Sequence, residues 1–293
     1  PENQPTLVGP YLVVEGGVER LLERVATLDL ESETVGEIRR RLVSLDERES
    51  TLLAEYSQVV VDAELRTQLL SLLSRNVSPE RTLELIDLAG HGSRADRELV
   101  VDALSRTSMD QLPGLFDVLP RTTDEGNIDI LSAIVSVLRR HPHGEFVPSD
   151  VHVEAVRSLM GAENGSVARL AIAVAGRVPI PALFEDIVVL VTEDPAAPIR
   201  IESMRSLGLM ARTGSGQEPA LEVLFGLRTH PDPSTRIAAF EEMRGLLDAE
   251  LAGELLDRLA EESWPEARRT AIAAAIDVAD PHIDIRIADW LTD

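Results

Sequence analysis

The 293-residue sequence predicts an all-α chain, folded as an α-solenoid of about seven stacked helix hairpins. Two observations predict this class. A dipeptide anchor, a small or apolar residue followed by arginine, recurs with a mean step of about 34 residues. Apolar residues at helical spacing precede most of these anchors, whereas alternating strand patterns are nearly absent. Because one hairpin cannot bury both of its apolar faces, such hairpins are stable only as a stack.

The anchors open the second helix of each hairpin. They are Leu65-Arg66, Asp96-Arg97, Ile128-Asp129, Ala168-Arg169, Ile199-Arg200, Thr235-Arg236 and Ala267-Arg268. Their steps range from 31 to 40 residues, and aspartate replaces arginine in the third anchor.

The first helix of a hairpin is predicted before most anchors. The predicted segments are Ser78 to Gly90, Pro148 to Gly161, Ile180 to Thr192, Pro219 to Arg228 and Leu251 to Glu262. Leu251, Leu255 and Leu259 show the spacing of one helical face. Ser78 followed by Pro79 is typical of a helix start, with an N-cap residue and proline at the first helical position.

The chain ends are predicted to differ from the repeats. Residues 1–14 contain three prolines and are expected to be an extended tail. Residues 15–60 are expected to form helices that cap the array, because Val18, Leu21, Leu22 and Val25 share a helical face. Residues 61–293 are then a single repeat array.

Three of the second-helix segments resemble the HEAT-repeat family. They are Pro198 to Gly208 (PIRIESMRSLG), Thr235 to Phe240 (TRIAAF) and Glu266 to Ala275 (EARRTAIAAA). They are similar to the sequence pattern of the second helix in that family, which is valine-arginine, then paired small residues, then leucine-glycine. The resemblance covers about residues 60 to 290 and implies a right-handed solenoid. It implies little about function, because such folds have many roles.

Composition excludes several chemistries. The formal net charge is -23, all 28 basic residues are arginine, and cysteine is absent. Catalysis by lysine or cysteine, thiolate metal sites and disulfides are therefore excluded. The acidic surplus disfavours nucleic acid and anionic membrane surfaces. Absence of lysine fits either a halophilic surface or codon bias in a GC-rich genome.

An acidic residue precedes most anchor arginines. Glu163 and Glu262 each lie six residues before their arginine, and Asp232 lies four before. One interpretation is an arginine row that binds anions. The favoured interpretation is a structural ladder in which each arginine has its own preceding acid and these groups satisfy turn amides and neighbouring repeats.

A histidine cluster is a candidate metal site. His141, His143 and His152 lie near Glu145 and Asp150, and imidazole and carboxylate groups bind zinc. The spacing matches no ordered zinc motif, and the loop accounts for the longest anchor step. The favoured interpretation is a solvated inserted loop, with no metal and no cofactor.

The leading functional hypothesis is a non-catalytic protein-interaction scaffold that uses the concave face of the solenoid. Candidate positions on the second helices are Glu98, Asp102, Glu202, Arg205, Glu241 and Glu242. Most are acidic, which predicts a protein partner with a basic surface, no binding of nucleic acid and no insertion of this segment into a membrane.

Two alternatives stay open at this point. The chain is either an enzyme-accessory protein, similar to HEAT-like lyases that attach bilin chromophores, or a structural domain of a larger cell-envelope assembly. The cytoplasm is the expected location; a periplasmic or extracellular domain whose signal or anchor has been removed is the alternative.

Overall fold

The computed structural model describes most of the chain from residue 94 onward and short pieces before it. The described residues are 6–8, 11–13, 82–83, 85–87, 94–141, 146–178, 180–193, 196–213 and 217–292. They are all-α apart from one short hairpin, as the sequence predicts. The chain divides into two compact units, residues 1–140 and 141–293, and the division lies at the loop that carries the histidine cluster. The predicted helical cap at 15–60 and the anchor at Arg66 lie outside the described residues.

The first unit contains the hairpin and three described α-helices. Strands β1 (Thr6–Val8) and β2 (Tyr11–Val13) pair antiparallel in the segment expected to be an extended tail. The helices are α6 (Arg94–Ser105), α7 (Leu112–Val118) and α8 (Asp124–Arg140). Short 3-10 turns, η2 (Met109–Gln111) and η3 (Leu119–Arg121), flank α7. Helices α6 and α8 pack together, and the apolar core that they share with α7 includes Val100, Phe116 and Ile130.

Helix α7 is absent from the sequence prediction. Its sequence, LPGLFDV, combines Pro113 and Gly114, which usually indicate a turn. Here the proline stands in the first turn, where its missing N–H costs nothing, and Leu112, Leu115 and Phe116 bury their side chains. Tertiary burial therefore outweighs the poor local propensity of this segment.

The second unit is built from nine described α-helices. They are α9 (Asp150–Met160), α10 (Gly165–Arg177), α11 (Phe184–Glu193), α12 (Ala197–Arg212), α13 (Gln217–Gly226), α14 (Pro233–Met243), α15 (Ala249–Arg258), α16 (Pro265–Ile276) and α17 (Pro281–Thr292). Two 3-10 turns, η4 (Pro181–Leu183) and η5 (Leu227–Thr229), adjoin α11 and α13. The first helices predicted at 148–161, 180–192, 219–228 and 251–262 correspond to α9, α11, α13 and α15.

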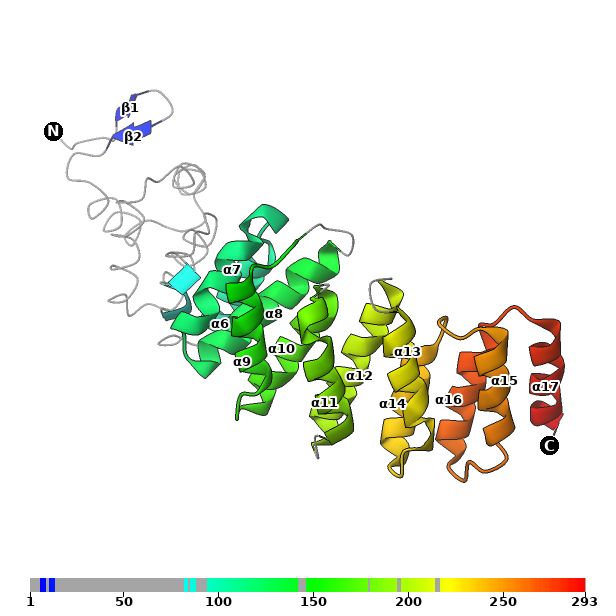
Figure 1. Cartoon of the computed structure of the whole chain (residues 1–293). Coiled ribbons are helices and arrows are strands. Elements are labelled where there is room, and N and C mark those ends of the chain that lie inside the picture. Colours follow the sequence, from blue (N-terminus) through cyan, green and yellow to red (C-terminus); the bar gives the residue numbers. More distant parts are fainter. Residues whose placement is uncertain are drawn as a thin grey trace. The chain divides into compact units, whose positions relative to one another are not determined.

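These helices pack in two layers (Figure 1). The helices that carry the anchors, α10, α12, α14 and α16, each contact the next along the unit. The intervening helices cover them: α9 packs on α10, α11 and α13 on α12, and α15 and α17 on α16. The contact between α10 and α12 is the most extensive in the unit, and the core lies between the layers.

Polar residues before the helices fix where they begin. The side chain of Asp232 accepts hydrogen bonds from the N–H groups of Ser234 and Thr235 at the start of α14. Asp248 caps α15 and Asn164 caps α10 in the same way. Such side chains satisfy N–H groups that the helix itself leaves free.

Glycine permits the close approach of α10 to α12. A Cβ atom at Gly176 would lie 2.6 Å from Cα of Ser206, nearer than real Cβ atoms come. The hydroxyl of buried Ser206 also donates to the carbonyl oxygen of Ile172 at 2.8 Å. The two backbones therefore meet almost directly, with a side-chain hydrogen bond that joins the helices.

A search of the described helices for a membrane span gives a negative result: none is both long and apolar enough to cross a bilayer.

Candidate partner-binding surface

Two anchor arginines of the second unit, Arg200 and Arg236, reach forward to the next helix that carries an anchor. Nε of Arg200 donates to Thr235 Oγ1 at 2.9 Å, and its Nη2 lies 3.3 Å from Asp232. Arg236 holds both carboxylate oxygens of Glu262, with Nε to Oε2 at 2.7 Å and Nη2 to Oε1 at 2.8 Å. These acids also cap the turns that precede their own helices. Each acid therefore joins its turn to the preceding helix that carries an anchor.

The first unit has the same contact, with a different acceptor. Arg97 on α6 donates to both oxygens of Asp129 on α8, each at 3.2 Å. Asp129 is the residue that replaces arginine in the third anchor. The exception in the sequence thus has a physical reason: the carboxylate of Asp129 is the acceptor for Arg97. Because residue 129 is not an arginine, it has no guanidinium group that could bind an acid further along the chain. Burial raises the pKa of Asp129, and the Arg97 charge opposes this rise.

The predicted ladder is present at Arg97, Arg200 and Arg236, but its connections run in the other direction. Sequence reasoning paired each arginine with the acid before it, whereas Arg200 and Arg236 bind the acid 32 and 26 residues later. Within its own turn, Arg236 binds carbonyl oxygens instead, with Nη1 to His230 O at 2.7 Å. Because the guanidinium groups of Arg97, Arg200 and Arg236 are occupied, these three anchors do not form an open anion-binding row.

Further arginine bridges were missed by the sequence analysis. Arg212 and Arg244, at the ends of α12 and α14, donate to Glu242 and Asp277 at 3.1 and 3.3 Å. Arg157 and Arg286 similarly join α9 to Asp186 near the start of α11 and α17 to Asp257 on α15. The signal in the sequence that could have indicated the bridges of Arg212 and Arg244 is the spacing of 32 residues between these two arginines.

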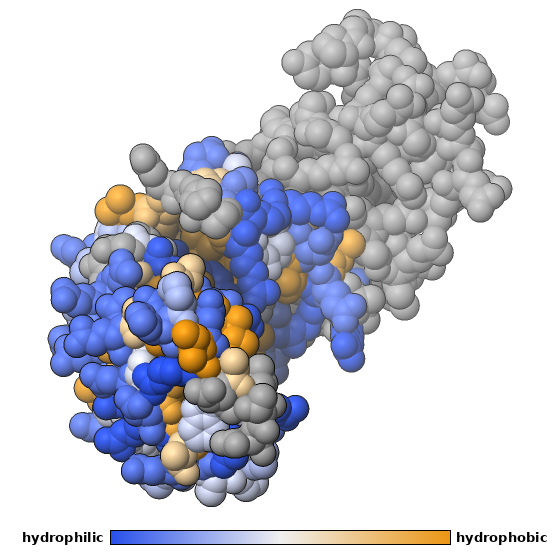
Figure 2. Space-filling view, turned by 90° about the vertical axis from the view of Figure 1, so that its right-hand side faces the viewer, coloured by the Kyte–Doolittle hydropathy of each residue, from blue (hydrophilic) through white to orange (hydrophobic). Residues whose placement is uncertain are grey.

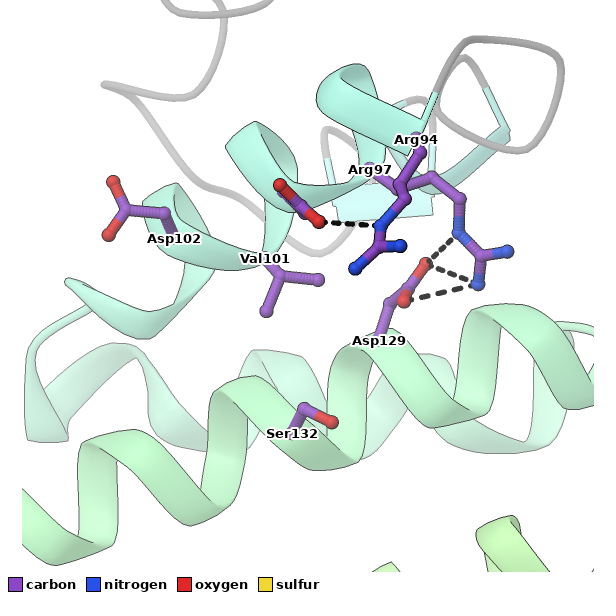
Figure 3. Close-up of a pocket in the computed structure, with 7 residues that line it drawn as sticks. Arg94, Arg97, Val101, Asp102, Asp129 and Ser132 are labelled. Carbon is purple, nitrogen blue, oxygen red and sulfur yellow. Dashed lines mark hydrogen bonds and ion pairs between the residues drawn. The ribbon is translucent and has the colours of Figure 1, made fainter.

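An open groove of about 810 Å³ lies between α6 and α8 (Figure 3). Its lining residues are Arg94, Arg97, Glu98, Val101, Asp102, Asp129 and Ser132. Figure 3 shows the Arg97–Asp129 pair at one end, Asp102 toward the other end, and Val101 and Ser132 between them. The groove therefore combines a small apolar and hydroxyl floor with carboxylates at its edges.

Two predicted site residues, Glu98 and Asp102, lie in this groove. Each has an arginine partner on its own helix: Arg94 Nε lies 2.8 Å from Glu98, and Arg106 lies 2.5 Å from Asp102. All four side chains are more than half exposed, so these pairs are worth only about 0.3–0.5 kcal/mol each. A basic side chain from a partner can replace such weak contacts.

The other candidates lie on α12 and α14. Glu202 pairs with Arg205 at 3.3 Å, and Glu241 is exposed. Glu242 lies in the contact with Arg212, with its side chain 18% exposed. Burial raises the pKa of Glu242, and its hydrogen bond with Arg212 opposes this rise. Glu242 therefore contributes to helix packing.

Three candidates share one register. Asp102, Arg205 and Glu241 each follow their anchor arginine by five residues. Within the second unit this register carries Arg205 on α12 and Glu241 on α14. The register is therefore mixed in charge, and the candidate residues named from the sequence already include Arg205 among the acids.

The histidine loop gives no metal cluster among the described residues. His143 and Glu145 lie outside them. His152 is buried at the start of α9, where its Nδ1 accepts from the N–H of Ser149 and its own N–H donates to the Ser149 hydroxyl. Its ring stacks on Phe146 at 6.2 Å. His152 therefore caps a helix.

Comparison with known proteins gives matches among solved structures only. No protein-family model matches it, and no curated protein matches it. Among solved structures, one similar chain is an engineered protein determined by crystallography. It shares 15% identity with a TM-score of 0.40, and the match covers 81% of this chain and 97% of that one.

Proposed function

We propose that the chain is a right-handed, HEAT-like α-solenoid of about seven hairpins that acts as a non-catalytic scaffold for a basic polypeptide. Three features support the repeat architecture: the two helix layers, the successive contacts of α10, α12, α14 and α16, and the ion pairs from an anchor arginine to the turn before the next anchor helix. A stack of this kind offers long rows of side chains for binding.

The groove between α6 and α8 is the observation that carries the functional proposal. Glu98 and Asp102 line it with weakly paired carboxylates, and Val101 provides apolar contact. A lysine or arginine side chain fits this combination, because its alkyl stem packs on the floor while its charge meets the carboxylates. The net charge of -23 steers a basic partner toward the chain.

Charge reversal at the groove tests the proposal. We expect the double variant Glu98→Arg with Asp102→Arg to bind a basic partner with an affinity lower by about tenfold or more, because like charges in an interface repel. The partner is identified by capture from the native host with quantitative mass spectrometry, and its affinity is then measured by titration. Circular dichroism checks that helicity is unchanged.

A matched reversal on other helices is the control. Glu185→Arg with Glu222→Arg makes the same change in net charge at exposed positions of α11 and α13. Equal weakening by both double variants would show that only overall charge matters, which contradicts a specific groove.

The surface of α12 and α14 has its own test. Charge reversal at Glu202 and Glu241 together is expected to weaken the binding of the same partner more than either single charge reversal does. If capture is unaffected, the scaffold binds through the first unit without this surface.

A further inference from the structure

The groove between α6 and α8 already holds a cationic group of the chain itself. Arg94, the first residue of α6, lines the groove, and its Nε donates to Oε1 of Glu98 at 2.8 Å. Figure 3 shows the Arg94 side chain pointing from α6 toward α8, with the Arg97–Asp129 pair on its other side in this view. A guanidinium group therefore occupies the place where the proposed function puts a basic side chain of the partner.

Arg94 is held only weakly. Its Nε is the one nitrogen that donates to Glu98, and the side chains of the two residues are 92% and 67% exposed. Two further features disfavour the pair. The arginine precedes the glutamate, which is the weaker order for residues four apart on a helix, and a positive charge at a helix start opposes the helix dipole. Arg94 can therefore leave Glu98 at little cost in free energy.

Arg97, on the same helix, shows a firm contact for comparison. It donates from Nε and Nη2 to the two carboxylate oxygens of Asp129, and their side chains are 31% and 12% exposed. Its Nη2 also donates to the carbonyl oxygen of Glu125 at 3.3 Å. Arg97 therefore belongs to the packing of α6 on α8, whereas Arg94 is a surface group that lies over the groove.

An arginine from a partner can bind Glu98 better than Arg94 does. Because Arg94 and Glu98 lie on the same helix, one helical turn limits their approach, and only Nε meets the carboxylate. A guanidinium group that enters along the groove is free of this limit and can place two parallel N–H groups on both carboxylate oxygens. Its alkyl stem then covers Val101. The ammonium group of lysine is a point charge and lacks this paired geometry.

We propose that the α6–α8 groove binds an arginine side chain of the partner, and that Arg94 is an internal competitor which this arginine displaces from Glu98. The inference rests on the proposed function. It adds the kind of side chain that is recognised and the contact within the chain that opens on binding. Removal of Arg94 is therefore expected to raise the affinity of the groove, whereas removal of an ordinary contact residue lowers it.

The test needs a local readout, because a cationic probe meets carboxylates elsewhere on this chain. The net charge is -23, and hydrophilic residues cover much of the end of the second unit that Figure 2 shows. Two short peptides with blocked ends serve as probes; each carries a single arginine or a single lysine among glycine and serine residues. NMR signals of the Val101 methyl groups in the full chain report binding in the groove. We expect saturable shifts, with the arginine peptide bound about threefold or more tightly.

Arg94→Gln is the decisive variant. We expect it to bind the arginine peptide about two- to fivefold more tightly than the parent, because the contact that it removes is a weak surface pair. Arg121→Gln is the matched control: it removes the same charge at an exposed position outside the groove and should bind as the parent does. In a Glu98→Gln background, Arg94→Gln should give no gain, because the carboxylate for which the two guanidinium groups compete is absent.

The possible failures are distinct. If Arg94→Gln binds no more tightly than the parent, while Glu98→Arg with Asp102→Arg abolishes the Val101 shifts, the competition is refuted and the proposed function stands. An equal gain in Arg121→Gln would trace the effect to overall charge and refute the competition as well. Equal binding of the two peptides would refute the preference for arginine. If neither peptide shifts the Val101 signals, in the parent or in Arg94→Gln, both the inference and the proposed function fail.

Discussion

At the residue scale, the Arg236–Glu262 pair is the strongest test of the ladder. Both side chains are largely buried, at 13% and 9% exposure, and two parallel hydrogen bonds join them. We expect Arg236→Gln to lower the free energy of unfolding by about 1–3 kcal/mol, measured by urea titration. Arg258→Gln, at an exposed pair 3.9 Å from Glu261, should change it by less than about 0.5 kcal/mol. Similar effects of the two substitutions would contradict a structural role for the ladder.

Two glutamates are expected to give opposite pH dependence. The hydrogen bond from Arg236 lowers the pKa of Glu262 below its ordinary 4.5, so its stabilisation is complete above that value and is lost as pH falls through the folded-state pKa. Burial raises the pKa of Glu242 above 4.5, so its contribution is present at low pH and is lost as pH rises. Relative to the parent, Glu262→Gln should therefore lose stability as pH rises toward 4.5, and Glu242→Gln should gain it above 4.5. Urea titrations from about pH 3 to 7 compare them; parallel curves would refute the assignment.

At the scale of elements, the contact of α10 with α12 depends on the absence of a side chain. Gly176→Ala would place a methyl group against the backbone of Ser206, which cannot move away as a flexible side chain could. We expect a loss of about 1–3 kcal/mol in thermal or urea unfolding. Gly226→Ala, at the end of α13 with open space around it, is expected to be neutral or to stabilise by up to about 1 kcal/mol. If both variants lose stability, the cause is the backbone conformation of the glycines, and crowding between α10 and α12 does not explain the effect.

The sequence was a good guide to helices and a poor guide to their partners. The helices α9, α11, α13 and α15 follow from apolar spacing and caps, because these signals are local. The helix α7 was missed because Pro113 and Gly114 resemble a turn, although burial decides its structure. The acid that meets Arg236 was misassigned because both Glu262 and Asp232 lie near an anchor, and only the stacking of α14 on α16 chooses between them.

At the scale of the whole molecule, the ladder uses arginines while many carboxylates remain on the surface. The net charge of -23 then acts as self-repulsion in the folded state. Added salt screens exposed charges beyond a Debye length of about 10 Å at 0.1 M, and it affects the half-buried ion pairs less. We therefore expect the melting temperature to rise between about 0.1 M and about 1 M potassium chloride. Replacing the exposed acids of three first helices by glutamine should reduce this rise; they are Glu185, Glu218, Glu222 and Glu250. A melting temperature independent of salt in both proteins would refute self-repulsion and favour codon bias as the cause of the missing lysines.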